Sequence, residues 1–534
     1  MKIKTSLYGF ISLLLVISLL MSFSLTCAED EHVYYGFIPI GTDAGDPNMY
    51  PQRRNIEELI DKVIYNYTPP EGTAILDVIA TEDDTYVEIW DILAKERIGS
   101  ATLNKLEKYT TFIKFGTFFK VIANKRVSVL QSGGYWEYGA TGDTTFYPAD
   151  EGGFIGKRFT FTPLSFPNAY ITYRYGSNFL CTALEDTEVV IYDSTGKEVT
   201  RFTLKQGESL PYNRGRLVNR RNKGHPTHGG GDSIIFRAES TGLILVRTAT
   251  QRSFLAVPAV TGGWVGKLFV TPILLAVDEP GSNQVLIIVP IEPGTVSIYD
   301  GKMNLLAEKS FTQEDIDNKV FWFYSFGKPS QTIAIIKSTC KITVLEGSTY
   351  IPPELGKTTI GPEDLGSNIA YMGARANEET RFYVPSTAII FAPEDLTIIV
   401  DGETKSLKKD DFIILDRGVH EIKASHEVII QLNCPGNPLT IVIYGEPGPA
   451  VFTYGSNPIE TKITGWTDWA SYLISIQDIR RTIEVPKGFA EAPAAGINWT
   501  PILIAATVAA AAAGGGFFIL RRRRSLRLHQ PHHH

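Results

Sequence analysis

Cysteine is scarce in this chain of 534 residues, which has only four, at positions 27, 181, 340 and 434. Cys27 falls in an apolar N-terminal segment that we expect to be removed, as argued below. The remaining odd number, spread over distant segments, does not make a disulfide framework. We therefore expect the folded parts of the chain to depend on hydrophobic burial alone.

Enzyme signatures are also missing. The sequence contains no H-E-x-x-H, G-x-S-x-G, P-loop or C-x-x-C motif, the patterns that mark common metal, nucleophile, phosphate and redox sites. Carboxylates are plentiful, so composition leaves a glycosidase pair open, but nothing in the sequence places two of them together. We expect a non-catalytic protein without a cofactor.

Positive charge is sparse between the two apolar ends of the chain. All 58 acidic residues lie in the segment 29–500, whereas seven of the 51 basic residues lie outside it. This segment therefore carries 44 basic and 58 acidic residues, a net charge of −14. Because nucleic-acid binding needs a basic surface, we expect no nucleic-acid partner.

The two ends of the chain predict export and anchoring. Residues 1–28 place Lys2 and Lys4 before an apolar run, with small residues near Cys27 for cleavage, as in a secretory signal peptide. The uncharged stretch from Pro501 to Leu520 is long enough to span a bilayer as a helix. Five arginines follow it and favour a cytoplasmic tail. We predict a single-pass type I protein of the cell membrane.

Four copies of one pattern fill the exported segment. Each copy is an apolar strand, an acidic turn and a second strand that ends near an aspartate. Anchored on Asp83, Glu185, Glu292 and Glu394, the copies are spaced by 102, 107 and 102 residues. Such a period indicates tandem modules or a closed array.

Short runs of Val, Ile, Thr, Tyr and Phe between turn residues indicate strands, and helical periodicity is confined to residues 55–64 and 467–480. We predict an all-β fold of tandem antiparallel β-sandwich-like modules, with a β-propeller made from the same repeats as the alternative. In Val87-Glu88-Ile89 the alternation predicts one solvated face, whereas the uniformly apolar Val189-Val190-Ile191 predicts burial on both faces.

The predicted domains, in chain order, are the signal peptide 1–28, an N-terminal extension with a short helix 29–72, β module 1 73–165, β module 2 166–275, β module 3 276–375, β module 4 376–450, a membrane-proximal segment 451–487, a stalk 488–500, the transmembrane helix 501–520 and a basic cytoplasmic tail 521–534.

The repeat motifs resemble the domain family named after the N-terminal region of the IgGFc-binding protein. The matching stretches are residues 80–87, 124–133, 204–207 and 264–269. The third copy departs from the family at Glu292-Pro293, and the family's cysteines are missing. The resemblance implies an extracellular adhesion or structural role and transfers no catalytic residue. The C-terminal anchor and basic tail also resemble those of envelope proteins, including surface-layer components.

Three kinds of candidate site remain. The acidic turns, such as Glu82-Asp83-Asp84, supply oxygen ligands of the kind that Ca²⁺ takes, although acidic residues also cap turns. A basic loop in module 2 suits an acidic glycan or protein partner, although a solvated loop explains it equally. Its contact residues are Arg214, Arg216, Arg220, Arg221, Lys223, His225 and His228. Asn66 and Asn498 begin N-glycosylation sequons.

Aromatic residues near the membrane are a further feature. Trp466, Trp469 and Tyr472 pack in a stalk module or lie against the bilayer interface. Together these patterns predict a non-catalytic cell-surface protein for adhesion or surface-layer-like envelope assembly, with other envelope proteins or further copies of itself as partners. The alternative is a receptor-like module that binds a soluble glycan or protein, and a surface glycosidase comes last.

Overall fold

The structure is a computed structural model, and it describes part of the chain. The described residues are 31–38, 73–114, 116–132, 146–161, 177–210, 216–218, 235–248, 254–273, 282–327, 332–350, 361–362, 365, 368–385, 387–434, 449–454, 457–464 and 471–489. The chain divides into two compact units, Met1–Glu484 and Val485–His534. All contacts discussed below lie in the first unit.

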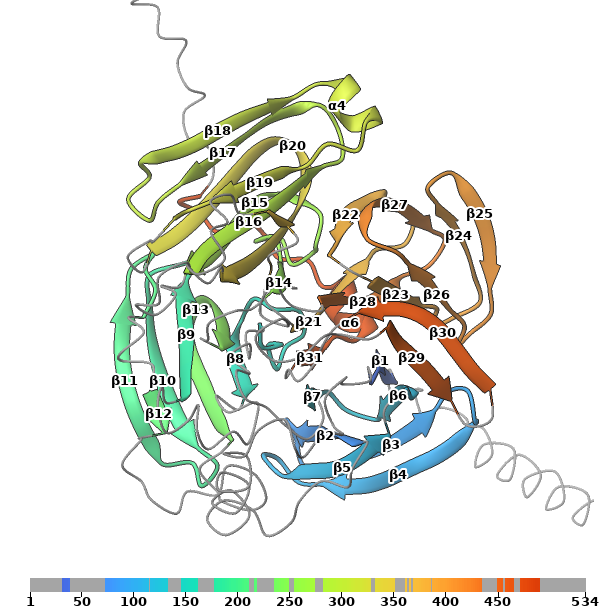
Figure 1. Cartoon of the computed structure of the whole chain (residues 1–534). Helices are drawn as coiled ribbons and strands as arrows, with labels where there is room; N and C mark the ends of the chain where they lie inside the picture. The colour runs from blue at the N-terminus through green and yellow to red at the C-terminus, as the bar shows by residue number, and fades with distance from the viewer. Residues whose placement is uncertain are drawn as a thin grey trace, which may run out of the picture. The chain divides into compact units, whose positions relative to one another are not determined.

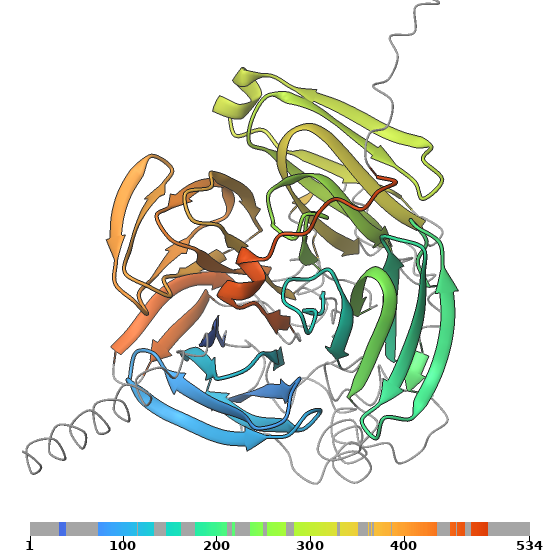
Figure 2. The ribbon, with the colours of Figure 1, turned by 180° about the vertical axis from the view of Figure 1, so that it is seen from behind.

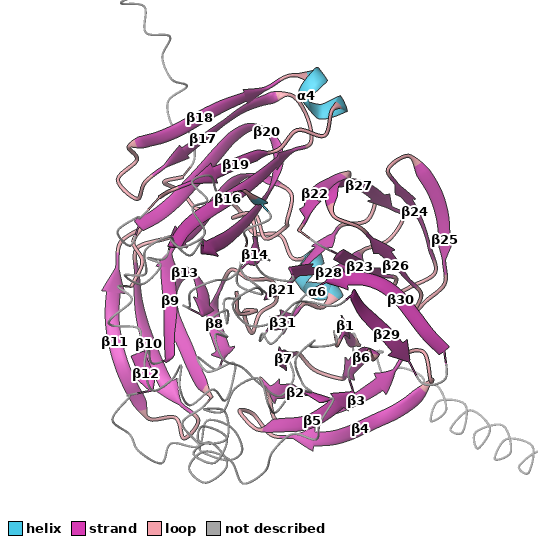
Figure 3. Ribbon diagram, in the orientation of Figure 1, coloured by secondary structure: helices cyan, strands magenta, loops and turns pink. Residues whose placement is uncertain are grey.

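Antiparallel strands make up most of the described chain, which confirms the predicted all-β class (Figures 1 and 3). Two short helices accompany them in the described ranges, α4 (Gln313–Asp317) and α6 (Ile476–Arg480). Neither has the length and apolarity needed to cross a bilayer. The predicted signal peptide, the helix at 55–64 and the transmembrane stretch 501–520 lie outside the described residues.

Module 1 contains six consecutive strands that alternate between two sheets. They are β2 (Thr73–Ala80), β3 (Thr85–Asp91), β4 (Glu96–Leu103), β5 (Lys108–Lys114), β6 (Phe118–Ala123) and β7 (Val127–Ser132). One sheet has the order β7-β2-β5 and the other β6-β3-β4. Each sheet gains one strand from elsewhere in the chain, since β1 (His32–Phe37) pairs with β6 and β31 (Ser471–Leu473) pairs with β7.

Module 4 repeats this topology. Its strands are β23 (Thr387–Phe391), β24 (Leu396–Val400), β25 (Glu403–Leu407), β26 (Phe412–Leu415), β27 (Gly418–Ala424) and β28 (Val428–Cys434). The added strands are β21 (Asn368–Ala374), which pairs with β28, and β22 (Thr380–Val384), which pairs with β27. Both added strands come directly before the module.

In modules 2 and 3 one long strand, β13 (Phe236–Thr248) or β20 (Thr332–Tyr350), takes the place of the last two strands of module 1, β6 and β7. It pairs with the strands that would otherwise lie in two separate sheets. Module 2 contains β8 (Gly156–Phe161), β9 (Ser177–Ala183), β10 (Thr187–Asp193), β11 (Glu198–Leu204), β12 (Arg216–Val218) and β13 (Phe236–Thr248). Module 3 contains β14 (Phe254–Val257), β15 (Gly266–Ile273), β16 (Ser282–Pro290), β17 (Gly294–Tyr299), β18 (Leu305–Phe311), β19 (Trp322–Ser325) and β20 (Thr332–Tyr350). A separate hairpin joins β29 (Pro449–Tyr454) and β30 (Asn457–Thr464).

The source of the added strand distinguishes module 1 from the others. In modules 3 and 4 the strands that complete both sheet regions come before the other strands of the module in the chain. β14 and β15 precede β16 and pair with β20, and β21 and β22 precede β23 and pair with β28 and β27. In module 1 the place equivalent to β14 and β21 is taken by β31, from beyond module 4. The pairing therefore returns the chain from the last module to the first.

Burial follows the predicted alternation. Val87 and Ile89 of β3 are fully buried while Glu88 between them is partly exposed, and Val189 and Ile191 of β10 are buried together with Val190. This confirms both readings of the strand patterns. A buried cluster also joins Leu130 of module 1 to the core of module 2.

Strand register aligns the modules residue by residue. When the modules are aligned on their acidic turns, one position of the last strand is occupied by Leu130, Arg247, Leu345 and Gln431 in modules 1 to 4. These residues pair with Asp77, Leu180, Ile287 and Ile389 of the first strand. Two modules thus place a polar residue where the other two have leucine. The position after it carries Gln131, Glu346 and Leu432 in modules 1, 3 and 4.

Candidate functional site

The acidic turns cap the neighbouring loop of their own module. Asp83 Oδ1 accepts a hydrogen bond from the Lys105 amide at 2.9 Å, and in module 4 Asp395 Oδ1 accepts one from the Lys409 amide at 2.9 Å. Asp186 accepts from the Gln206 amide in the same way. The side-chain hydrogen bond from Lys205 lowers the pKa of Asp186. These carboxylates thus satisfy backbone donors, the usual role of aspartate in turns.

The aspartate at the end of the second strand does the same. Asp91 accepts from the Ala94 amide at 2.9 Å, Asp193 from the Thr195 amide at 2.9 Å and Asp300 from the Lys302 amide at 2.8 Å. Among the described residues, no three His, Cys, Asp or Glu side chains gather to hold a metal ion. Calcium binding by the acidic turns therefore has no support from their geometry.

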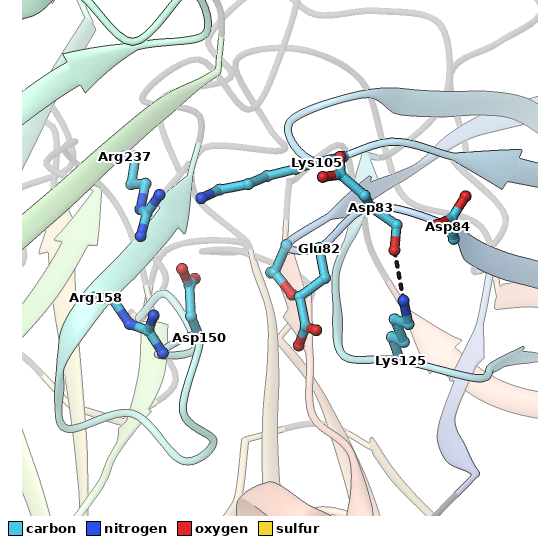
Figure 4. A pocket seen from close by; sticks show the side chains of 9 residues that line it. Glu82, Asp83, Asp84, Lys105, Lys125, Asp150, Arg158 and Arg237 are labelled. Atoms are coloured by element: carbon cyan, nitrogen blue, oxygen red, sulfur yellow. Dashed lines mark hydrogen bonds between the residues drawn. The ribbon is translucent and has the colours of Figure 1, made fainter. Parts of the chain in front are cut away.

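A polar pocket of ≈ 530 Å³ lies where the first acidic turn faces β8 and β13 (Figure 4). It is lined by Thr81, Glu82, Asp83, Asp84, Lys105, Lys125, Asp150, Arg158 and Arg237. Eight of these nine residues are ionisable. The pocket therefore offers charges of both signs, and no aromatic side chain is among the residues that line it.

The charges in this pocket are unevenly satisfied. The Lys125 ammonium donates to the Asp83 carbonyl oxygen at 2.6 Å, and the guanidinium of Arg237 pairs with Glu239 at 2.8 Å. The Nε atom of Arg237 is buried and has no hydrogen-bond partner in the described chain. The Lys105 ammonium extends across the pocket towards Arg237 (Figure 4), so two cations face each other there.

Asp150 is the most enclosed acid of the pocket. Thr160 donates to it through its amide at 2.9 Å and its hydroxyl at 3.2 Å. Burial raises the pKa of Asp150 above the usual aspartate range, against the lowering effect of the Thr160 hydrogen bond. Sequence reasoning missed Asp150, Arg158 and Arg237, because strand pairing brings them to the acidic turn from beyond the first repeat.

The second feature is the C-terminal clasp, which we define as residues 471–483, comprising β31, α6 and the three residues after α6 (Figure 2). Tyr472 of the clasp is buried, and its ring packs edge-on against Tyr147 with centroids 4.6 Å apart. Tyr472 therefore belongs to the core shared by modules 1 and 2, and not to a stalk module or a bilayer interface as predicted; Trp466 and Trp469 lie outside the described residues. The segment predicted to be membrane-proximal thus contributes buried structure.

Asp478 is the centre of the clasp. It is fully buried and forms an ion pair with Arg126, 352 residues away in sequence. Its carboxylate also accepts from the Gly153 amide at 2.8 Å and from the Ser475 amide at 2.6 Å. Ser475 and Asp478 form a capping box at the start of α6. The S-x-x-D spacing was the one sequence signal for this site.

The clasp also contacts the segments that lead into modules 3 and 4. Arg375, after β21, donates through Nε to the Ile479 carbonyl at 3.0 Å and through a terminal nitrogen to the Arg481 carbonyl at 3.1 Å. The Ile483 amide donates to the Thr261 carbonyl at 2.8 Å. A Cβ on Gly262, whose φ is +89°, would lie 2.6 Å from the Arg481 oxygen. One short segment therefore contacts residues of all four module regions.

Polar side chains make two further junctions between modules. Arg247 of β13 and Glu346 of β20 form an ion pair at 2.8 Å with 1% and 2% of their side chains exposed. Gln431 of β28 accepts from the Phe37 amide at 2.7 Å, and Gln131 of β7 donates to the Phe37 carbonyl at 2.8 Å. Each of these buried polar side chains therefore has a charged or hydrogen-bonding partner on the other side of its junction.

Most sequence-predicted contact residues fall outside the described chain. This applies to Arg214, Arg220, Arg221, Lys223, His225, His228, Asn66 and Asn498. Arg216 begins β12, and its Cα pairs with that of Asn178 of β9. Arg216 is not among the residues that line the pocket.

Comparison with known proteins leaves the family open. No protein-family model matches the chain, and no curated protein matches it. The resemblance to the IgGFc-binding protein domain therefore stays a prediction.

Solved structures are only distantly similar. HutD from Pseudomonas fluorescens is 12% identical to this chain. The match covers 31% of this chain and 77% of HutD, with a TM-score of 0.11. YhaK from Escherichia coli is 12% identical over 32% of this chain and 87% of its own, with a TM-score of 0.12. The BSP domain of a biofilm-associated protein is 10% identical over 77% and 61%, also at 0.12. Scores this low carry no argument about fold or function.

Proposed function

We propose that this chain is a non-catalytic, single-pass type I protein of the cell surface, whose tandem β-sandwich modules serve adhesion or envelope assembly. The terminal signals of the sequence support the orientation, and the four-fold repeat supports a structural role. The sandwich form is part of the proposal, supported by two sheets of strands with buried side chains in modules 1 and 4.

The observation that carries the proposal is the clasp. Residues 471–483 contact the regions of all four modules, and they precede the predicted anchor at 501–520 by fewer than twenty residues. The buried ion pair between Arg126 and Asp478 joins module 1 to this segment. The clasp joins the module regions to one another at the C-terminal end of the first unit.

Electron microscopy of the purified full chain in detergent, with and without Ca²⁺, tests the proposed role. Ordered arrays or filaments would support envelope assembly. Monodisperse particles under both conditions, together with no adhesion of cells that display the chain, would contradict it. Calcium serves here only as a probe of lateral assembly, since the acidic turns are engaged by backbone amides.

A receptor role is the second candidate, and the pocket favours it. The Lys105 ammonium, which makes no hydrogen bond or ion pair with the described residues, and the buried Nε of Arg237 are the kind of polar groups that bind a ligand. A single ligand bound by a monomeric particle would support this role over assembly.

A further inference from the structure

We infer that the pocket between the first acidic turn and strands β8 and β13 is a binding site for an acidic sugar residue, such as a uronate or a sulfated hexose. This inference gives a ligand class to the receptor candidate and rests on it. It is independent of self-assembly, so the two can fail separately.

The argument begins with two cations that face each other. The Lys105 side chain belongs to a solvent-exposed residue and is directed towards Arg237 across the pocket (Figure 4), and its ammonium makes no hydrogen bond or ion pair with the described residues. The Nε of Arg237 is buried and unsatisfied in the same sense. Like charges repel, and an oxyanion between them would accept charge-assisted hydrogen bonds from the Lys105 ammonium and from the unsatisfied Nε of Arg237.

The rest of the lining indicates what carries the oxyanion. Glu82 and Asp84 line the pocket, and their carboxylates have no partner in the described residues, so both can accept hydrogen bonds from hydroxyl groups. Apart from Thr81, every lining residue is charged. A ligand that carries one anionic group and several hydroxyls, without an apolar face, fits these donors and acceptors.

Size favours a sugar over a bare ion. The pocket volume of ≈ 530 Å³ lies within the range of about 300–1,000 Å³ typical of small-molecule sites. Phosphate or sulfate alone would leave most of this space to water and would leave Glu82 and Asp84 without a donor. An acidic monosaccharide or a terminal acidic residue of a glycan would occupy both ends of the site.

The repeat provides a matched control for this site. Lys409 occupies in module 4 the turn position of Lys105 in module 1, and an aspartate caps the amide of each at 2.9 Å. Lys409 is exposed and does not line the pocket. Lys105→Ala and Lys409→Ala therefore remove the same side chain from the same kind of turn, and only the first removes a pocket cation.

Isothermal titration of the full chain in detergent with glucuronic acid tests the inference, with glucose and inorganic sulfate as comparison probes. We expect glucuronic acid to bind more tightly than either, Lys105→Ala to weaken it by about tenfold or more, and Lys409→Ala to leave it unchanged. Unfolding midpoints of both variants should match the parent protein, which shows that the turn remains folded.

Each other outcome overturns the inference. Absence of glucuronic acid binding, or equal loss in both lysine variants, would remove the site. Equal binding of glucose would remove the role of the facing cations. Sulfate binding as tight as that of glucuronic acid would leave a site for a free anion and refute the sugar. None of these results alters the expectation of arrays, so failure of the ligand is distinguishable from failure of the assembly role.

Discussion

Replacing Asp478 by asparagine tests whether the clasp is fastened by its buried ion pair. The Asp478 carboxylate accepts hydrogen bonds from Arg126, Gly153 and Ser475. An amide of the same shape cannot accept from all of them, and it leaves the buried Arg126 guanidinium without a counter-charge. Removing one partner of a buried pair costs about 3–5 kcal/mol, so Asp478→Asn should lower the free energy of unfolding by that amount.

The other helix of the described chain supplies the control. Asp315 forms the same capping box with Thr312 at the start of α4, but it is only partly buried and has no ion-pair partner among the described residues. Loss of a cap typically costs about 1 kcal/mol. Asp315→Asn should therefore cost at least about 2 kcal/mol less than Asp478→Asn, a difference of about thirtyfold in the population of the opened state.

Limited proteolysis of the full chain measures this difference, because cleavage of a transiently opened segment follows its equilibrium population when reclosing is fast. Hydrogen exchange of the peptide covering 471–483 locates the opening. We expect Asp478→Asn to accelerate exchange there and Asp315→Asn to leave it unchanged. Equal effects of the two substitutions on cleavage and exchange would refute the claim that the buried pair holds the clasp.

Three further predictions follow from the same contacts. Gly262→Ala should expose the clasp to protease, because its Cβ would meet a clasp carbonyl 2.6 Å away, whereas Gly196→Ala, with a similar positive φ and open space, should not. Arg247→Leu alone should lower the free energy of unfolding in urea by about 3–5 kcal/mol. Adding Glu346→Leu should restore most of that stability, because leucines occupy equivalent positions in other modules. A double variant that is no more stable than the single variant would contradict this. Affinity for glucose 6-sulfate should rise as the solution is acidified from neutral pH, because burial raises the pKa of Asp150 and its protonation removes a negative charge from the pocket; unchanged or falling affinity would count against that.

The repeat and the strand class could be predicted because they are local properties of the sequence. Alternation around Glu88 and continuous apolarity around Val190 indicated the burial that the structure has. The acidic turns were located correctly as turns. Their chemistry was open because a carboxylate that caps a backbone amide and one that binds a cation carry the same sequence signature.

The contacts between distant segments could not be predicted in this way. The pairing of β31 with β7 and the ion pair of Arg126 with Asp478 join residues more than 300 positions apart, and no periodicity links such segments. One offset also shows the limit of motif alignment. The structural caps match Asp83 with Asp186, one residue beyond the Glu185 used to measure the repeat.

The pocket depended on the same long-range pairing. Asp150 precedes β8 and Arg158 lies in it. β8 pairs with β13 of module 2, and Arg237 lies in β13 itself. The sequence showed three acids at 82–84 and could not show which cations face them. A search for clusters in sequence therefore favoured the basic loop of module 2, most of which lies outside the described residues.

Protease treatment of intact cells that express the chain tests the surface location on which the proposed role depends. A protease that cannot enter cells, followed by detection with an antibody against the last residues of the chain, separates the two sides of the membrane. We predict that intact cells lose the module-bearing region and retain a short C-terminal fragment containing residues 501–534. Modules that survive in intact cells and are degraded only after permeabilisation, in a protein shown to unfold normally in vitro, would contradict the account.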